Sequence, residues 1–173
     1  IMKIKYAVLP TAIAMLFSAS SFADNTGKIF FTGSVKAPTC TVNNGAKNVY
    51  IDMGVHETGE FPAMYTMVKS DEKVILSLTE CDGNTANLAL TANERDGNDI
   101  IKLKDTANSA KGLGIVLVDS DTNTYRQVDG TVTGKAIVSR EATFEFQPYL
   151  ISLADVVTAG RINATVDYTI TYN

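Results

Sequence analysis

The most informative segment of the sequence reads Ile162-Asn163-Ala164-Thr165-Val166-Asp167-Tyr168-Thr169-Ile170-Thr171-Tyr172. Apolar and polar residues alternate throughout it. Side chains along a β-strand point alternately to the two faces of the sheet, and β-branched and aromatic residues favour strands. The pattern therefore predicts a half-buried strand whose apolar face is formed by Ile162, Ala164, Val166, Tyr168, Ile170 and Tyr172.

This predicted strand lies at the very end of the sequence. A strand with an apolar face and an unpaired edge invites aggregation unless another strand covers that edge. We therefore expect both edges of residues 162–172 to be paired. The sequence leaves open which segment, from which molecule, pairs with the second edge.

A second alternating segment lies near the other end of the sequence. Ile29, Phe31, Gly33 and Val35 share one face, and Pro38, which lacks a backbone donor, separates this arm from the rest of the chain. If the arm folds onto its own domain, the protein is a monomer; if it adds a strand to another copy, head-to-tail repetition builds an open filament. Burying its three large apolar side chains would contribute on the order of 5–9 kcal/mol before ordering costs.

The first 23 residues have the features of a secretory signal peptide. Lys3 and Lys5 precede an apolar run over residues 6–17, and Ser21-Phe22-Ala23 resembles a cleavage site. The run is shorter than the roughly 20 residues that span a bilayer. We expect export, followed by an arm at residues 24–36 and one domain at residues 37–173.

The charge of the chain excludes some partners. The net charge is −4, and it becomes −6 without Lys3 and Lys5, because residues 1–23 contain no acidic residue. An acidic surface with both signs interspersed argues against binding to nucleic acid or to anionic membranes.

The two cysteines, Cys40 and Cys81, favour a disulfide in an exported chain. Such a bridge closes a loop of about 40 residues, which the chain-entropy model values at roughly 4 kcal/mol. The alternative is a pair of free or metal-binding thiols. With His56 as the single histidine and no Cys-x-x-Cys pattern, ligands for a metal or redox site are lacking.

The rest of the sequence predicts an all-β domain. Short strands, Val49–Met53 among them, alternate with turns rich in Asn, Asp and Gly, as at Asp129-Gly130, and no helical periodicity occurs after the signal. This pattern is typical of an antiparallel β-sandwich.

No pattern in the sequence predicts catalysis. The run at residues 119–123 begins like a calcium loop, but Thr124 and Gly130 stand where that loop needs glycine and glutamate. His56 has no nucleophile at a suitable spacing. We expect no enzyme activity, no metal and no cofactor.

The chain resembles the pilin subunits of bacterial chaperone–usher fimbriae, the type 1 and P-pilus kind. The residues that carry the resemblance are Phe31-x-Gly33-x-Val35-x-x-x-x-Cys40-x-Val42, Leu76-x-Leu78-x-x-Cys81, Gly160 at the fourteenth position from the end, and the alternation that ends at Tyr172. The resemblance implies an incomplete immunoglobulin-like β-sandwich that lacks its last strand and carries an N-terminal donor-strand extension.

The resemblance also implies partners and site residues. A periplasmic chaperone first lends a strand to the groove beside the last strand, and the extension of the next subunit replaces it at the outer-membrane usher. The donor strand would present Ile29, Phe31, Gly33 and Val35, and the acceptor groove would be bordered by Gly160, Ala164, Val166, Tyr168, Ile170 and Tyr172. The product would be a cell-surface fimbria. The alternative is a secreted carbohydrate-binding sandwich that closes on its own arm, which the absence of tryptophan disfavours.

Overall fold

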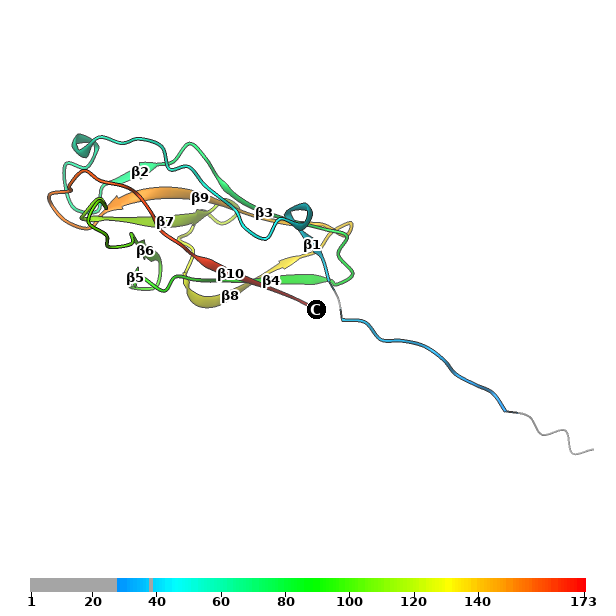
Figure 1. Cartoon of the computed structure of the whole chain (residues 1–173). Helices are drawn as coiled ribbons and strands as arrows, with labels where there is room; N and C mark the ends of the chain where they lie inside the picture. The colour runs from blue at the N-terminus through cyan, green and yellow to red at the C-terminus, as the bar shows by residue number, and fades with distance from the viewer. Residues whose placement is uncertain (1–27, 38) are drawn as a thin grey trace, which may run out of the picture. The chain divides into compact units, whose positions relative to one another are not determined.

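The computed structural model describes residues 28–37 and 39–173 of the chain, which divides into two units, Ile1–Val35 and Lys36–Asn173. The expected signal peptide at residues 1–23 lies outside the described residues, as does the start of the arm. Residues 28–37, blue in Figure 1, belong to no helix or strand. The side chains of Ile29, Phe30, Phe31 and Val35 are exposed.

The second unit consists of two antiparallel sheets, which confirms the predicted all-β class (Figure 1). Within the described residues, the order of the larger sheet is β1 (Thr41–Val42), β3 (Val74–Thr79), β9 (Ala142–Ser152), β7 (Leu113–Asp119), β6 (Ile100–Lys102) and β5 (Arg95–Asp96), and β2 (Met67–Lys69) also pairs with β9. The order of the smaller sheet is β10 (Asp167–Tyr172), β4 (Thr85–Thr91) and β8 (Asp129–Ala136).

The hydrophobic core lies between the two sheets. Strand β4 alternates buried and half-buried residues along its whole length, which is the burial pattern of a strand with one face on a core. Its inward side chains, Ala86, Leu88 and Leu90, are at most 4% exposed. They belong to one cluster with inward residues of the larger sheet, among them Leu76 and Phe146.

Two sequence expectations for individual elements are wrong. The predicted strand Val49–Met53 has no ladder partner among the described residues and runs as an extended segment between the 3-10 turns η1 (Asn43–Gly45) and η2 (Thr58–Glu60). The predicted turn at Asp129-Gly130 instead begins strand β8, which pairs with β4. In both cases the outcome depends on a neighbouring strand that is distant in the sequence.

Candidate functional site

Strand β10 pairs on one edge only. All of its residues, Asp167–Tyr172, pair with β4, and β10 is the first strand of the smaller sheet, so its other edge has no partner in the described part of the chain. The preceding residues 162–166 form no ladder, although the Lys104 amide donates to the Asn163 carbonyl at 2.8 Å. The ladder is therefore shorter than the predicted strand, while the alternation of exposure persists from residue 162 to residue 172.

The inward face of this run is incompletely covered. Its apolar side chains pack against the core cluster, yet every one of them is only half-buried, whereas the neighbouring side chains of β4 are buried. Close-packed interiors leave few voids larger than a water molecule. Half-burial of a whole strand face therefore marks a space beside β10 that the second unit itself does not fill. The half-buried apolar residues of this face are Ile162, Ala164, Val166, Tyr168, Ile170 and Tyr172.

That space is a groove with a volume of about 1180 Å³. One wall is the run from Ile162 to Tyr172, and the other is formed by residues 47–51 and Met53. Its floor consists of core side chains from both sheets, including Leu76, Leu90 and Leu117. The groove therefore opens directly onto the hydrophobic core between the sheets.

The second wall has few backbone partners of its own. Residues 46–53 are extended and mostly exposed. Among the described residues, the bonds from this wall include one from the Asp52 amide to Glu72 Oε2 at 2.9 Å and one that the Lys47 carbonyl accepts from the Tyr168 hydroxyl at 2.6 Å. Both walls therefore offer backbone groups that a further strand could pair with.

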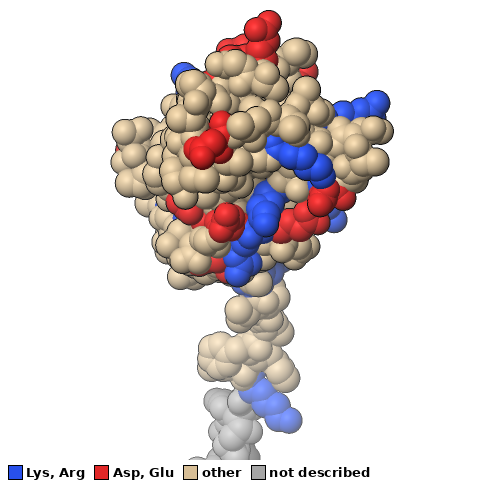
Figure 2. All heavy atoms as spheres, turned by 90° about the vertical axis from the view of Figure 1, so that its left-hand side faces the viewer, with Lys and Arg blue, Asp and Glu red and all other residues tan. Residues whose placement is uncertain are grey.

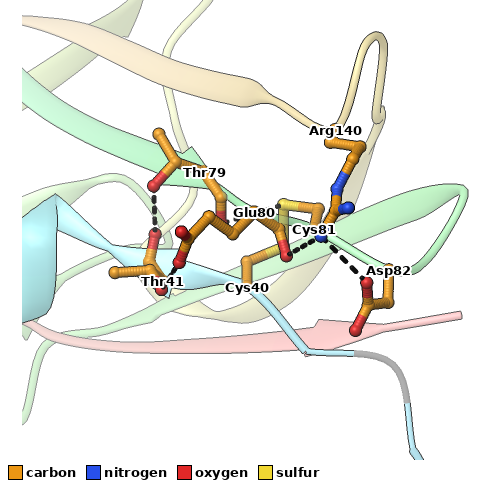
Figure 3. The surroundings of a disulfide bond; sticks show 7 residues. All are labelled: Cys40, Thr41, Thr79, Glu80, Cys81, Asp82 and Arg140. Atoms are coloured by element: carbon orange, nitrogen blue, oxygen red, sulfur yellow. Dashed lines mark hydrogen bonds and ion pairs between the residues drawn. A yellow bond between two sulfur atoms is a disulfide. The ribbon is translucent and has the colours of Figure 1, made fainter.

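A disulfide lies beside the groove. Cys40, which lines the groove, is bonded to Cys81, as predicted from the cysteine count (Figure 3). Beside it β1 pairs with β3, and the Thr41 hydroxyl donates to Glu80 Oε2 at 3.0 Å. Arg140 donates to the Glu80 carbonyl at 3.4 Å and to Asp82 at 3.2 Å (Figure 3).

The structure brings most of the predicted acceptor residues together. Ala164, Val166, Tyr168, Ile170 and Tyr172 all line the groove. Gly160 does not line it: this residue lies against the backbone of Ser109 and Ala110. The sequence reasoning missed the second wall and the floor, because these residues come from segments that only folding brings together.

The predicted donor residues lie in the first unit. Ile29, Phe31 and Val35 are exposed, and no atom lies within 4 Å of the position that a Cβ of Gly33 would take. Their role as a donor strand therefore stays a prediction.

His56 lies close to the second wall and contacts two acceptors. Its Nδ1 is 3.1 Å from Glu60 Oε2, and its Nε2 is 2.8 Å from the carbonyl oxygen of Met53. A neutral imidazole donates from one nitrogen only, so the protonated ring satisfies both contacts. Burial alone would lower the pKa of His56, but the hydrogen bonds to Glu60 and Met53 and the charges of Glu60 and Asp71 outweigh burial and raise this pKa above 6.5.

The raised pKa of His56 predicts that the loop at residues 53–60 is stabilised in acid. The contribution is fully present below the unfolded pKa of about 6.5 and is lost as the pH rises through the higher folded pKa. We expect these amides to be less protected from hydrogen exchange at about pH 8 than at about pH 5.5, after correction for the intrinsic exchange rate. His56→Gln is the control and should lose the difference; the same pH response in both proteins would contradict the prediction.

A smaller cavity of about 240 Å³ lies beside Asp119, Tyr125 and Arg126. Figure 2 shows a face on which basic and acidic side chains are interspersed. Within residues 28–37 and 39–173, no three His, Cys, Asp or Glu side chains form a group suited to a metal ion. No helix in these ranges would reach across a bilayer.

Comparison with solved structures identifies the fold. The chain is similar to the P pilus rod subunit PapA, with a TM-score of 0.63 and 18% identity over 78% of this chain and 99% of PapA. It is also similar to the CupB6 tip adhesin from Pseudomonas aeruginosa, with a TM-score of 0.57 and 20% identity over 65% of this chain. The chain spans 33% of that adhesin. These likenesses confirm the predicted incomplete immunoglobulin-like fold of pilin subunits.

Comparison of sequences identifies the family. The type-1 fimbrial protein subunit of Serratia marcescens is 31% identical over an alignment that covers 97% of this chain and 99% of that protein. A family model described as fimbrial protein matches residues 29–173. Because both matches span most of the chain, the protein belongs to the fimbrial protein family, whose members are structural subunits of surface-exposed pili.

Proposed function

We propose that this chain is a structural subunit that polymerises by donor-strand exchange. The arm of one copy, residues 24–36, would fill the groove of the next copy, with Ile29, Phe31, Gly33 and Val35 facing its floor. Before that, after export, a periplasmic chaperone would hold the groove, and the outer-membrane usher would be the place of exchange. The observation that carries the proposal is the groove beside β10, which opens onto the core.

The size and shape of the groove favour a peptide strand as its occupant. Its volume of about 1180 Å³ exceeds the roughly 300–1,000 Å³ of small-molecule pockets. The run from Ile162 to Tyr172 would extend over roughly 36 Å at about 3.3 Å per residue, and residues 28–36 over roughly 30 Å. An extended arm therefore matches the length of the wall that it would cover.

The arm and the groove are chemically complementary. The groove floor is apolar, and one face of the arm presents Ile29, Phe31 and Val35, whereas its opposite face is polar apart from Phe30. An inserted strand would place these side chains between the sheets and would pair its backbone with the free edge of β10. Burying Ile29, Phe31 and Val35 would contribute on the order of 5–9 kcal/mol before the cost of ordering the arm.

Two adjacent phenylalanines of the arm allow a matched test. Phe31 lies on the proposed donor face and Phe30 on the opposite face, and their side chains are 92% and 81% exposed. We expect Phe31→Asp to abolish the polymers that resist detergent at room temperature, because a carboxylate would enter the apolar groove. Phe30→Asp should polymerise like the unchanged chain, because its side chain would face outward.

A mixing experiment completes the test. The Phe31→Asp chain retains an intact groove, so it should accept the arm of the unchanged chain and shorten its polymers as a terminator. Equal polymerisation of the two aspartate variants would contradict the proposed register. An unchanged chain that remains a monomer under all conditions would contradict the proposed function and would favour a sandwich closed by its own arm.

A further inference from the structure

A single side chain connects the two walls of the groove. The Tyr168 hydroxyl, from β10, donates to the carbonyl oxygen of Lys47 on the opposite wall, at a distance of 2.6 Å. Tyr168 and Lys47 both line the groove. The phenol ring therefore crosses the space between the walls instead of lying along the wall to which it belongs.

This contact competes with a strand that would lie between the walls. Neighbouring strands lie about 4.7–4.9 Å apart, so a strand between two others separates their backbones by about twice that distance. A strand inserted beside β10 would occupy the space that the Tyr168 side chain now crosses. Its backbone amides would also compete with the Tyr168 hydroxyl for the Lys47 carbonyl. We therefore expect a strand that fills the groove at this position to displace the Tyr168 hydroxyl from the Lys47 carbonyl.

A second tyrosine on the same face provides a comparison. Tyr172 also lines the groove and is also half-buried, two repeats of the alternation further along β10. No hydrogen bond from its hydroxyl is present among the described residues, whereas Tyr168 has the bond to Lys47. The two phenols therefore share their face and their burial but differ in the contact across the groove.

We propose that Tyr168 is a gating residue, which closes the empty groove through Lys47 and slows the insertion of a strand. The inference rests on the proposed function. A strand that enters the groove must first break this hydrogen bond. In the filled groove the hydroxyl makes no such bond, so removing the hydroxyl does not destabilise the filled state. The gate therefore acts on the rate of insertion and on the affinity derived from it, not on the rate of release.

The test compares two Tyr→Phe substitutions in the full-length chain. Phe31→Asp is present in every protein, so that the arm of the chain itself does not compete for the groove. The probe is a fluorescein-labelled peptide with the sequence of residues 28–36, and its uptake is followed by anisotropy under excess protein. We expect Tyr168→Phe to take up the peptide about 2–10-fold faster, because a partly exposed hydrogen bond contributes about 0.5–1.5 kcal/mol, and to release it at an unchanged rate. Tyr172→Phe removes a groove phenol that makes no contact across the walls, so it should accelerate uptake less than Tyr168→Phe does.

Each outcome has a defined meaning. Uptake by Tyr168→Phe that is no faster than uptake by the parent, or equal acceleration by both substitutions, overturns the gate and leaves the proposed function standing. Faster release from Tyr168→Phe overturns it as well, because the hydroxyl would then stabilise the filled groove. Failure of the parent to bind the peptide at any concentration overturns the proposed function, and the gate with it.

Discussion

Replacing Cys40 and Cys81 together by serine is expected to lower the free energy of unfolding by about 4 kcal/mol in the chain-entropy model. The disulfide joins residues 41 positions apart, and the loop it closes contains η1, the second wall of the groove, η2, β2 and β3. Without the bond, the unfolded chain gains the freedom of that loop. A loss of this size is a large fraction of the total stability of a small domain.

The folded state also depends on this bond locally. Among the described residues β1 pairs with β3 through Thr41 and Val42 alone, and Cys40 lines the groove. Loss of the disulfide therefore leaves the second wall attached by very few backbone pairs. We expect the double-serine variant to bind the arm peptide more weakly as well as to unfold more easily.

Urea denaturation followed by circular dichroism measures the loss of stability. The unchanged chain in reducing buffer is the control and should unfold at about the same urea concentration as the double-serine variant. A difference in unfolding free energy below about 1 kcal/mol between the oxidised chain and the variant would contradict the prediction, because the disulfide would then neither restrict the unfolded chain nor hold the second wall in the folded one.

Gly160→Ala is the second substitution with a large expected effect, a loss of about 3 kcal/mol of stability, at the upper end of the range for overpacking. A Cβ at this position would lie 2.2 Å from the amide nitrogen of Ala110 and 2.6 Å from the carbonyl oxygen of Ser109. Both are backbone atoms of buried residues, so no side chain can rotate away to make room.

The clash occurs where the chain begins its approach to the groove. The Arg161 amide donates to the Asn108 carbonyl at 2.7 Å, and the Ala110 amide donates to the Arg161 carbonyl at 3.1 Å. A shift of Gly160 breaks these bonds and displaces the start of the groove wall at Ile162. The expected loss therefore includes strain and unpaired backbone groups together.

Gly59→Ala is the matched control for Gly160→Ala. No atom lies within 4 Å of the position that its Cβ would take, and its φ is outside the left-handed region. The substitution should change the unfolding free energy by no more than about 0.5 kcal/mol, as is usual for surface positions. Similar urea transitions for the two alanine variants would contradict the close packing at Gly160.

Local patterns were sufficient for the fold class and for one wall of the groove. Period-two alternation is a property of neighbouring residues, so the inward face from Ile162 to Tyr172 was predictable residue by residue. The donor face expected for the arm stays a prediction, because residues 28–37 belong to no strand and are all exposed. The disulfide was predictable from having only two cysteines in an exported chain, because no other pairing within the chain exists.

Predictions failed where the outcome depended on distant segments. Val49–Met53 has the residues of a strand, yet no described segment forms a ladder with it. Asp129-Gly130 has the residues of a turn, yet β4 lies beside it and pairs with it as part of β8. The role of Gly160 in close packing was also hidden, because Ser109 and Ala110 lie some fifty positions earlier in the chain.

Alternation and composition were enough to predict that this protein is built from strands, which side chains of residues 162–172 face inward, and which cysteines are joined. Alternation is a property of neighbouring residues and composition is a property of the whole chain, so neither depends on how the chain folds. Three features depend instead on how distant segments pack. Among the described residues one edge of β10 is open, the segment from Lys47 to Met53 faces it, and the space between them reaches the core. The physical reason is that a groove is a missing contact, and a missing contact is defined only once all the other segments have taken their places.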